Sequence, residues 1–488
     1  MIWALLGVPT AAGAAAFFIR PDGPRRFLLL AAALAHAALT AACWGALPGP
    51  VLGGYLELDA AGRLFLSLTS VLFLATAAYA KGFLKSAGHS KEEEDAEGFL
   101  FDNAPEAVFI GCLLLFLGTM TLAALSQHFG LLWVGIEATT LVSAPLIHFH
   151  RQRSSLEATW KYLLICSVGI ALALLGNFFL AVAARHHQDL LMTGRELAAH
   201  AAELDQPWLK AAFLLFLVGY GTKMGLAPLH TWLPDAHSEA PSVVSALLSG
   251  ALLNCAFLAL MRVNAVLCAA GLADFTGGLL MGFGLLSMAV AAAFIIGQTD
   301  FKRMLAYSSV EHMGVLAFGV GLGAAAPAAM LHAVNHSLTK ALLFLTAGNL
   351  LAAGRTKSVG EVRGLLRALP FSGFLWLIGF LAITGSPPFG PFISELWILQ
   401  GALGRHHGAL AALYLALLAV VFVGMATIVL KMCHGEPSER FKVVPAEDDP
   451  WRLWPPALLA AAVLVLGLWV PRPLLDAVKE AAVVLGAR

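Results

Sequence analysis

Charged residues are scarce in this chain. Asp, Glu, Lys and Arg make up 12% of its 488 residues, whereas a soluble protein carries about 25%. Hydrophobic residues make up 59%, and the 30 acidic residues balance the 30 Lys and Arg residues. The zero formal net charge predicts neither a nucleic-acid partner nor an acidic substrate. The composition indicates a polytopic, all-α membrane protein.

Cysteine is also sparse, and its spacing excludes several kinds of site. The six cysteines lie far apart, mostly inside apolar runs, without a CxxC or Cys/His ligand spacing. A disulfide framework, a local zinc site and an iron–sulfur cluster are therefore not expected. We predict no metal and no cofactor in this chain. Its loops reach only about 25 residues, too short to fold alone, so a catalytic domain must come from other chains.

Long apolar runs dominate the rest of the sequence. Windows of about 20 residues predict about fourteen membrane crossings. They cover residues 1–19, 27–47, 63–83, 107–125, 130–149, 158–184, 208–229, 242–261, 275–297, 304–322, 326–351, 371–399, 409–431 and 454–470. The tail, residues 473–488, reads as a short amphipathic helix on the surface.

The positions of Lys and Arg predict the orientation. Positive charge follows the first apolar run rather than preceding it, so this run reads as a retained helix and not as a signal peptide. Most Lys and Arg residues fall in loops on one side, which predicts both termini outside a bacterial or archaeal inner membrane. The acidic run 91–97 then lies inside, either as a solvated loop or in contact with a partner.

One carboxylate lies in the middle of an apolar stretch. Glu137 sits near the centre of residues 131–145, LLWVGIEATTLVSAP. An acidic residue at a helix centre costs roughly 2.5 to 3.5 kcal/mol on insertion, so it faces protein or a wet cavity and marks an ion or proton path.

Two crossings are interrupted by glycine and proline. In the first, residues 219–241 (GYGTKMGLAPLHTWLPDAHSEAP), Lys223 precedes Gly225 and Pro228. Such a break exposes backbone groups that can hold water or an ion. Lys223 either serves this site or snorkels to a helix end. The loop that follows is either a proton entry mouth or a capped loop, and its polar residues are His230, Asp235, His237 and Glu239.

The second interruption, residues 385–395 (GSPPFGPFISE), ends at Glu395. Paired interrupted helices at corresponding positions indicate internal repeats. We therefore predict two inverted five-helix repeats with discontinuous seventh and twelfth helices. The predicted units are an N-terminal three-helix segment (1–106), the two repeats (107–262 and 263–432), and a C-terminal helix with its tail (433–488).

Three ionisable residues recur every four positions between the two breaks. His332, His336 and Lys340 therefore lie on one helical face. Histidine and desolvated lysine can pass protons in short steps, whereas a single buried histidine is more often a satisfied core residue. The preceding helix adds polar groups that belong either to this relay or to helix packing, namely Tyr307, Ser308, Ser309, Glu311 and His312.

Lys161 begins the sixth predicted crossing, one turn after Glu157. Two positions are open for its side chain: it snorkels to the membrane surface, or it reaches into the bundle beside Glu137. In the second case the movement of one charge would change the proton affinity of the other.

Five segments resemble the antiporter-like membrane subunits of complex I, Mrp-type antiporters and membrane-bound hydrogenases. They read LLWVGIEATTL, GTKMGLAPLHTWLPDAHSEAP, FKRMLAYSSVEHMG, HAVNHSLTKALLFLTAGNL and GSPPFGPFISELWIL. The first, with SLEATWKYLLICSVGIALALLGNFF after it, is most similar to the F-type subunit of hydrogenase-4 and formate hydrogenlyase-like complexes.

The resemblance implies a fourteen-helix fold with a proton half-channel in each repeat. Glu137 matches the family's glutamate of the fifth helix and Lys223 its lysine of the seventh. The central relay corresponds to His332, His336 and Lys340, and Glu395 to the terminal ionisable residue of the twelfth helix. Asn254 departs from the pattern, because many members have a lysine or histidine there and an amide cannot hold a proton.

Three functions follow from this resemblance. The first is a proton-translocating subunit of an energy-converting oxidoreductase, beside other membrane subunits and a peripheral arm whose chains carry Fe–S clusters with NiFe or flavin. The second is an Mrp-like cation/proton antiporter, with Na⁺ in place of some protons. The third is a membrane subunit that drives inorganic-carbon uptake. None of them places covalent chemistry in this chain.

Overall fold

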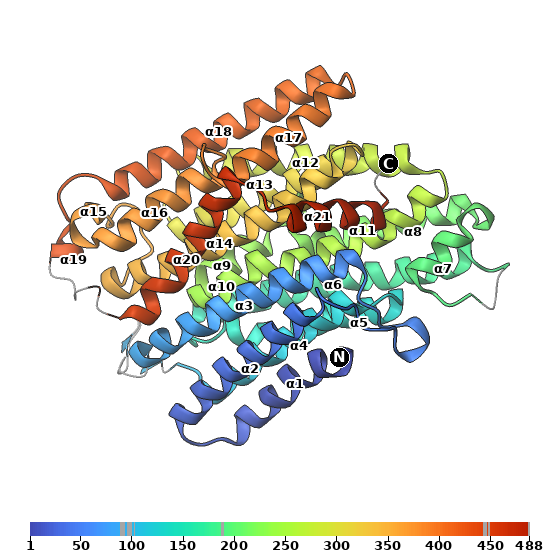
Figure 1. The fold of residues 1–488 in the computed structure, drawn as a ribbon. Coiled ribbons are helices and arrows are strands. Elements are labelled where there is room, and N and C mark those ends of the chain that lie inside the picture. The colour runs from blue at the N-terminus through green and yellow to red at the C-terminus, as the bar shows by residue number, and fades with distance from the viewer. Residues whose placement is uncertain are drawn as a thin grey trace.

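The protein is a bundle of long helices that run side by side (Figure 1). The computed structural model describes residues 1–87, 93–94, 100–101, 103–186, 190–442, 447 and 449–486. The acidic run 91–97 lies outside these residues, except for β1 (Glu93–Glu94), which pairs antiparallel with β2 (Leu100–Phe101).

Helices up to the end of the predicted first repeat occupy the blue to green part of the ribbon in Figure 1. They are α1 (Ile2–Phe18), α2 (Asp22–Ala42), η1 (Leu52–Gly54), α3 (Ala60–Ala87), α4 (Glu106–Leu125), α5 (Phe129–Ile147), α6 (Arg153–Ala183), α7 (Gly194–Ala199), η2 (Ala201–Glu203), α8 (Gln206–Met224), α9 (Trp232–Glu239), α10 (Ser242–Leu247), η3 (Leu248–Leu252) and α11 (Leu253–Ala269). The segment η3 is a π-helical turn that joins α10 to α11.

The remaining helices follow in yellow to red. They are α12 (Ala273–Ile295), α13 (Phe301–Gly321), α14 (Ala326–Gly354), α15 (Leu365–Ala368), α16 (Pro370–Ile383), α17 (Gly390–Gly404), α18 (Gly408–Cys433), α19 (Glu439–Lys442), α20 (Pro450–Leu468) and α21 (Arg472–Val484).

The predicted all-α membrane fold is confirmed. Ten of the described helices are long and apolar enough to cross a membrane, and α1 and α16 are shorter apolar helices. The other expected crossings correspond to α8, to α13 and to the pair α16 and α17. In the described part of the chain, the residues between the crossings form short helices, loops and the β1–β2 pair. The chain is a multi-pass membrane protein. The boundaries of the two repeats stay a prediction.

Small residues let two helix pairs pack closely. In the pair α6 and α8, a Cβ atom on Gly219 would lie 2.7 Å from the carbonyl oxygen of Gly169. In the pair α12 and α13, a Cβ atom on Gly314 would lie 2.6 Å from the carbonyl oxygen of Gly284. Without a hydrophobic drive between helices in lipid, such close backbone approach is what holds membrane helices together.

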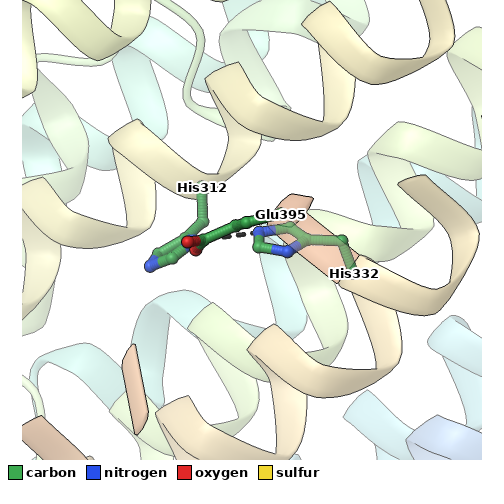
Figure 2. Close-up of side chains that lie close together, drawn as sticks. All are labelled: His312, His332 and Glu395. Carbon is green, nitrogen blue, oxygen red and sulfur yellow. Dashed lines mark hydrogen bonds between the residues drawn. The ribbon is translucent and has the colours of Figure 1, made fainter. Parts of the chain in front are cut away.

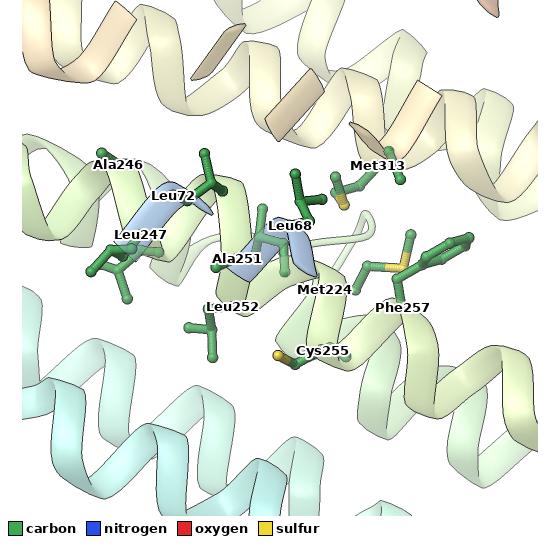
Figure 3. Packing of buried hydrophobic residues seen from close by; sticks show 14 of the residues in the cluster. Leu68, Leu72, Met224, Ala246, Leu247, Ala251, Leu252, Cys255, Phe257 and Met313 are labelled. Atoms are coloured by element: carbon green, nitrogen blue, oxygen red, sulfur yellow. The ribbon is translucent and has the colours of Figure 1, made fainter. Parts of the chain in front are cut away.

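The apolar core extends through most of the bundle, and one part of it lies where α3 meets α10, η3 and α11. Leu68 and Leu72 of α3 lie beside Leu252 and Phe257 there, and Met313 of α13 comes from the opposite side (Figure 3). Packing of this kind holds the polar side chains of the neighbouring helices in fixed positions.

Both predicted interruptions are present. The helix α8 ends at Gly225, whose φ of +87° is left-handed, and α9 begins only at Trp232. The indole N–H of Trp232 donates to the carbonyl oxygen of Thr222 over 2.8 Å. In the second interruption, the Asn335 amide donates to the carbonyl oxygen of Gly390 over 2.8 Å. Side chains from neighbouring helices thus satisfy carbonyl groups at both breaks.

The amphipathic tail forms α21, and much of its apolar face packs on the bundle. Ala477, Val478 and Ala481 are buried, and the helix packs against α3 and α14. Glu480 pairs with Arg63 of α3 over 2.9 Å. The tail is thus the expected short amphipathic helix, and its polar face with Asp476 and Lys479 lies exposed on the surface of the bundle.

Gly467 of α20 packs directly on the second interruption, and we expect Gly467→Ala to destabilise the fold. A Cβ atom there would lie 2.0 Å from the carbonyl oxygen of Pro388 and 2.4 Å from the carbonyl carbon of Phe389. Backbone atoms cannot swing away, so the overpacking should cost at least about 1–3 kcal/mol. The melting temperature in detergent measures this effect. Gly278→Ala in α12, which meets nothing within 4 Å, is the control, and equal melting temperatures would contradict the prediction.

Candidate functional site

Lys223 lies in the last turn of α8 and is fully buried. Its ammonium group donates to the hydroxyl of Thr140 on α5 over 2.8 Å and to the hydroxyl of Tyr162 on α6 over 2.7 Å. Tyr162 is in turn hydrogen-bonded to Ser143 over 2.6 Å. Because the partial negative charge at the C-terminal end of α8 favours a cation, the position suits a positively charged lysine. The snorkelling alternative is wrong, since the side chain points into the bundle.

Glu137 lies one turn before Thr140 on α5, partly buried against α6. The hydroxyl of Ser167 donates to its Oε1 atom over 3.0 Å, and its buried Oε2 atom has no protein partner among the described residues. No ion pair joins Glu137 to Lys223 in the part of the chain that the structure describes. The carboxylate and the ammonium group thus bind different hydroxyl groups, Ser167 in the first case and Thr140 with Tyr162 in the second, without direct contact.

Lys161 does not reach Glu137. Its ammonium group pairs with Glu157 over 2.6 Å and with Asp235 of α9 over 3.1 Å, and its side chain remains 45% exposed. The alternative that Lys161 reaches into the bundle beside Glu137 is therefore wrong. Two carboxylates at the helix end hold the lysine, so it stays outside the bundle, at the surface end of α6.

The segment predicted as a loop after the first interruption is mostly the helix α9, and its polar residues divide into paired surface groups and buried histidines. Asp235 binds Lys161, and Glu239 binds Lys357 over 2.7 Å. His237 is fully buried, and its ring stacks on Phe344 of α14 with the centroids 5.0 Å apart. His230 is also buried, with its ring 6.2 Å from that of Tyr307. The carboxylates of α9 thus form ion pairs with lysines of other segments, whereas the histidines face the two helices of the central cluster, α13 and α14.

The central cluster joins three helices. His312 of α13 and His332 of α14 share a hydrogen bond of 2.9 Å between Nδ1 and Nε2, and the other ring nitrogen of His332 contacts the Ser394 hydroxyl of α17 at 3.0 Å. The ring of His336 lies 5.2 Å from that of His312. Figure 2 shows the His312 and His332 side chains reaching toward each other with Glu395 beside them. These contacts form a hydrogen-bonded path from α13 to α17.

Lys340 continues the same face of α14 and is fully buried. Its ammonium group donates to the Ser308 hydroxyl over 2.5 Å and to the carbonyl oxygen of Leu305 over 2.7 Å. Like Lys223, it is held by neutral oxygen atoms and not by a carboxylate. Because a carboxylate does not neutralise it, the positive charge of Lys340 acts on the ionisable groups around it.

Glu395 lies at the second interruption. Its Oε1 atom is buried without a protein partner among the described residues, and a Cβ atom on Gly385 would lie 2.0 Å from Oε2. Only glycine leaves room for this carboxylate. One ligand atom each of His312, His332 and Glu395 lies within 4.8 Å of the other two. These donors suit a transition metal, but the His312–His332 hydrogen bond already accounts for two of them.

Asn254 also contacts the central helix. Its amide donates to the Ser337 hydroxyl of α14 over 2.7 Å and to the carbonyl oxygen of Gly250 over 2.9 Å. Its Oδ1 atom is buried and has no protein partner in the described part of the chain. The amide thus contacts the relay helix through a hydroxyl group and leaves one acceptor facing inward.

Comparison with known proteins decides the family. Residues 126–422, more than half of the chain, match the family model described as NADH:quinone oxidoreductase/Mrp antiporter, transmembrane. The chain belongs to this family. It is 36% identical over 394 residues to the hydrogenase-4 component F homolog of Methylacidiphilum infernorum (isolate V4), covering 79% of this chain and 80% of that relative. The resemblance found in the sequence is therefore confirmed.

Solved structures of other antiporter-like subunits share the fold. A chain of the membrane-bound sulfane sulfur reductase, an archaeal respiratory membrane complex, superposes with a TM-score of 0.86 at 21% identity and covers 99% of this chain and 97% of its own. A chain of respiratory complex I from Thermus thermophilus gives a TM-score of 0.76 at 24% identity, with 96% and 97% covered.

The roles of several polar residues in this antiporter-like subunit cannot be predicted from the sequence. Thr140, Tyr162 and Ser394 provide the hydroxyl groups that hold Lys223 and His332. Ser and Thr are common packing residues in membrane helices, so their types carry no signal. Buried Lys302 was not singled out either, and it donates to the carbonyl oxygens of Ser238 and Ala240. Its position just before the predicted crossing 304–322 gave no sign that its side chain is buried.

Proposed function

We propose that this antiporter-like subunit moves protons across the membrane as part of a multisubunit energy-converting oxidoreductase of the hydrogenase-4 type. Fully buried Lys223, bound to two neutral hydroxyl groups, is the observation that carries the proposal. A cation in this position costs several kcal/mol of desolvation, and an ion pair does not offset that cost. Buried charges inside a membrane protein typically mark the path of an ion or a proton.

The first half-channel would work through Glu137 and Lys223. A proton that arrives at Glu137 removes a negative charge near Lys223, and the loss of this charge changes the energy of the ammonium group. Thr140, Tyr162 and Ser167 each offer a hydroxyl that both donates and accepts. They would guide the proton between the two charges.

The central relay would continue through α13, α14 and α17. Lys340 and Ser308 lie at one end of the ionisable face, and the hydrogen-bonded series His312–His332–Ser394 leads toward Glu395. Imidazole rings accept a proton on one nitrogen and release it from the other. Asn254 would take part only by orienting water, because its amide holds no proton.

The host complex supplies the driving force in this proposal. Redox centres lie in partner chains of a peripheral arm, and neighbouring membrane subunits transmit their charge changes to Glu137. The predicted orientation, with both termini outside a bacterial or archaeal inner membrane, belongs to the same proposal. The similarity to the hydrogenase-4 component F homolog and the match to the NADH:quinone oxidoreductase/Mrp antiporter family support this assignment.

The experiment compares Glu137→Gln with Glu157→Gln in sealed inside-out vesicles from producing cells. Hydrogen, formate or NADH is supplied in turn, and a pH-sensitive dye reports proton uptake. We expect Glu137→Gln to lower uptake by about 100-fold, the order expected when a proton-transferring group is removed. Glu157 lies at the exposed end of α6, so its variant should pump normally.

Normal pumping in the Glu137→Gln vesicles would contradict the proposal. Uptake that requires a sodium gradient and no electron donor would instead identify a cation/proton antiporter. Equal assembly of both variants into the complex, followed by native gel electrophoresis, ensures that a loss of pumping is not a loss of protein.

A further inference from the structure

Glu311 is a buried carboxyl group in the middle of α13 that the proposed proton path leaves unused. Its side chain is 4% exposed, and its Oε2 atom lies 3.9 Å from Nε2 of His312, which is about 1 Å longer than a hydrogen bond. A carboxyl group buried without a bonded cation rests as the neutral acid, because its charged form is far more costly to desolvate. A proton is therefore stored beside the central cluster.

The position of Glu311 completes a connection through the His312 ring. Nδ1 of His312 shares a hydrogen bond with His332, whereas Nε2 is buried without a hydrogen-bond partner in the described part of the chain. An imidazole ring passes a proton onward when one nitrogen receives it and the other releases it. The free nitrogen is the one that faces Glu311, and a small rotation of the glutamate side chain closes the gap.

Lys340 is connected to the same stretch of α13. Its ammonium group binds the Ser308 hydroxyl, and Ser308 precedes Glu311 by three residues, so both side chains share a helical face. The charge of Lys340 acts on Glu311 without an ion pair between them. Along α13, Glu311 thus lies between the residue that binds Lys340 and the residue that binds His332.

The predicted repeats give the same position a second argument. The helices α5 and α13 hold corresponding places, because each is the second helix of its predicted unit. Each carries a single carboxylate, Glu137 on α5 and Glu311 on α13. If both half-channels work in the same way, an acid is expected at this place in the second repeat.

We propose that Glu311 is a proton-holding residue of the central relay, a proposal that rests on the proposed proton transport. The acid gives its proton to Nε2 of His312, while the Nδ1 hydrogen of that ring passes to His332. His332 releases its own Nδ1 hydrogen toward Ser394. The Glu311 carboxylate, stabilised by the nearby positive charge of Lys340, takes a proton from this ammonium group. Lys340 is then recharged from the first half-channel.

The test combines proton uptake with infrared spectroscopy of the assembled complex. Glu311→Gln nearly keeps the shape but cannot release a proton, so uptake in sealed vesicles should fall by about 100-fold. The carbonyl band of protonated carboxylic acids should lose the part that Glu311 contributes. Glu311→Asp keeps an acid and should retain more uptake than Glu311→Gln. Thr346→Val is the control and should pump normally, because this buried hydroxyl donates to Leu342 of its own helix.

Three results would overturn the proposal. Normal uptake in Glu311→Gln, with uptake lost in Glu137→Gln, would remove Glu311 from the path and leave the proposed function standing. An unchanged carboxylic acid band in Glu311→Gln would mean that the residue stores no proton. An equal loss of uptake in the Asp and Gln variants, with both fully assembled on native gels, would assign Glu311 to the fold alone.

Discussion

Lys223→Met should stop proton transfer while leaving the chain at least as stable as the wild type. The buried ammonium group binds only hydroxyl groups, so its desolvation is not offset by an opposite charge in contact. Replacing a buried charge by an apolar group of similar volume is often neutral or stabilising by about 1–4 kcal/mol. Proton uptake in the vesicle assay should fall by about 100-fold or more. The melting temperature should hold or rise.

The two readouts move in opposite directions, which separates a functional lysine from a structural one. Lys210→Met serves as the matched control, because Lys210 lies on the same helix, partly exposed, with its ammonium group 5.6 Å from the Phe275 ring. That variant should pump normally. A Lys223→Met protein that melts at a lower temperature and still pumps would show that the lysine serves the fold alone.

His332→Gln should break the central relay. Glutamine can still hydrogen-bond to His312 or Ser394, but a carboxamide neither binds nor releases a proton. Proton uptake should therefore fall by about 100-fold, as for the loss of an acid–base group. The quantity to measure is uptake per assembled complex, with the redox rate of the complex recorded in parallel.

His36 provides a control that is as buried as His332. Its two ring nitrogens contact the hydroxyls of Ser70 and Thr121, each over 3.0 Å. His36→Gln should lower the melting temperature, because an unpaired buried hydroxyl costs about 1–3 kcal/mol. Its pumping per folded molecule should be unchanged. If both histidine variants lose pumping equally, the effect is general damage to the bundle and the relay is not supported.

The crossings and both interruptions are predictable from the sequence for local reasons. Apolar length fixes where a helix can span the bilayer, and Gly225 and Gly385 mark the ends of broken helices because both adopt positive φ. The central ionisable face follows from a spacing of four residues. All of these signals lie within one helix.

Contacts between helices are not predictable in the same way. The partners of Lys223 lie 83 and 61 residues away in the chain, and hydroxyl side chains look the same whether they pack or bind a lysine. Lys161 was open to two positions because its surroundings depend on Asp235, 74 residues further on. The burial of α21 likewise depends on helices from distant parts of the chain. Tertiary packing decides each of these cases.

Hydroxyl groups bind Lys223, Lys340 and His332, and this has a consequence for the reversibility of proton transfer. A hydroxyl can rotate about its C–O bond and exchange the roles of donor and acceptor without displacing any heavy atom. A proton path built from such hydroxyl groups therefore does not favour one direction of proton transfer over the other. The same molecule should then run backwards, and drive its redox partners uphill, whenever the electrochemical gradient exceeds the span between their potentials.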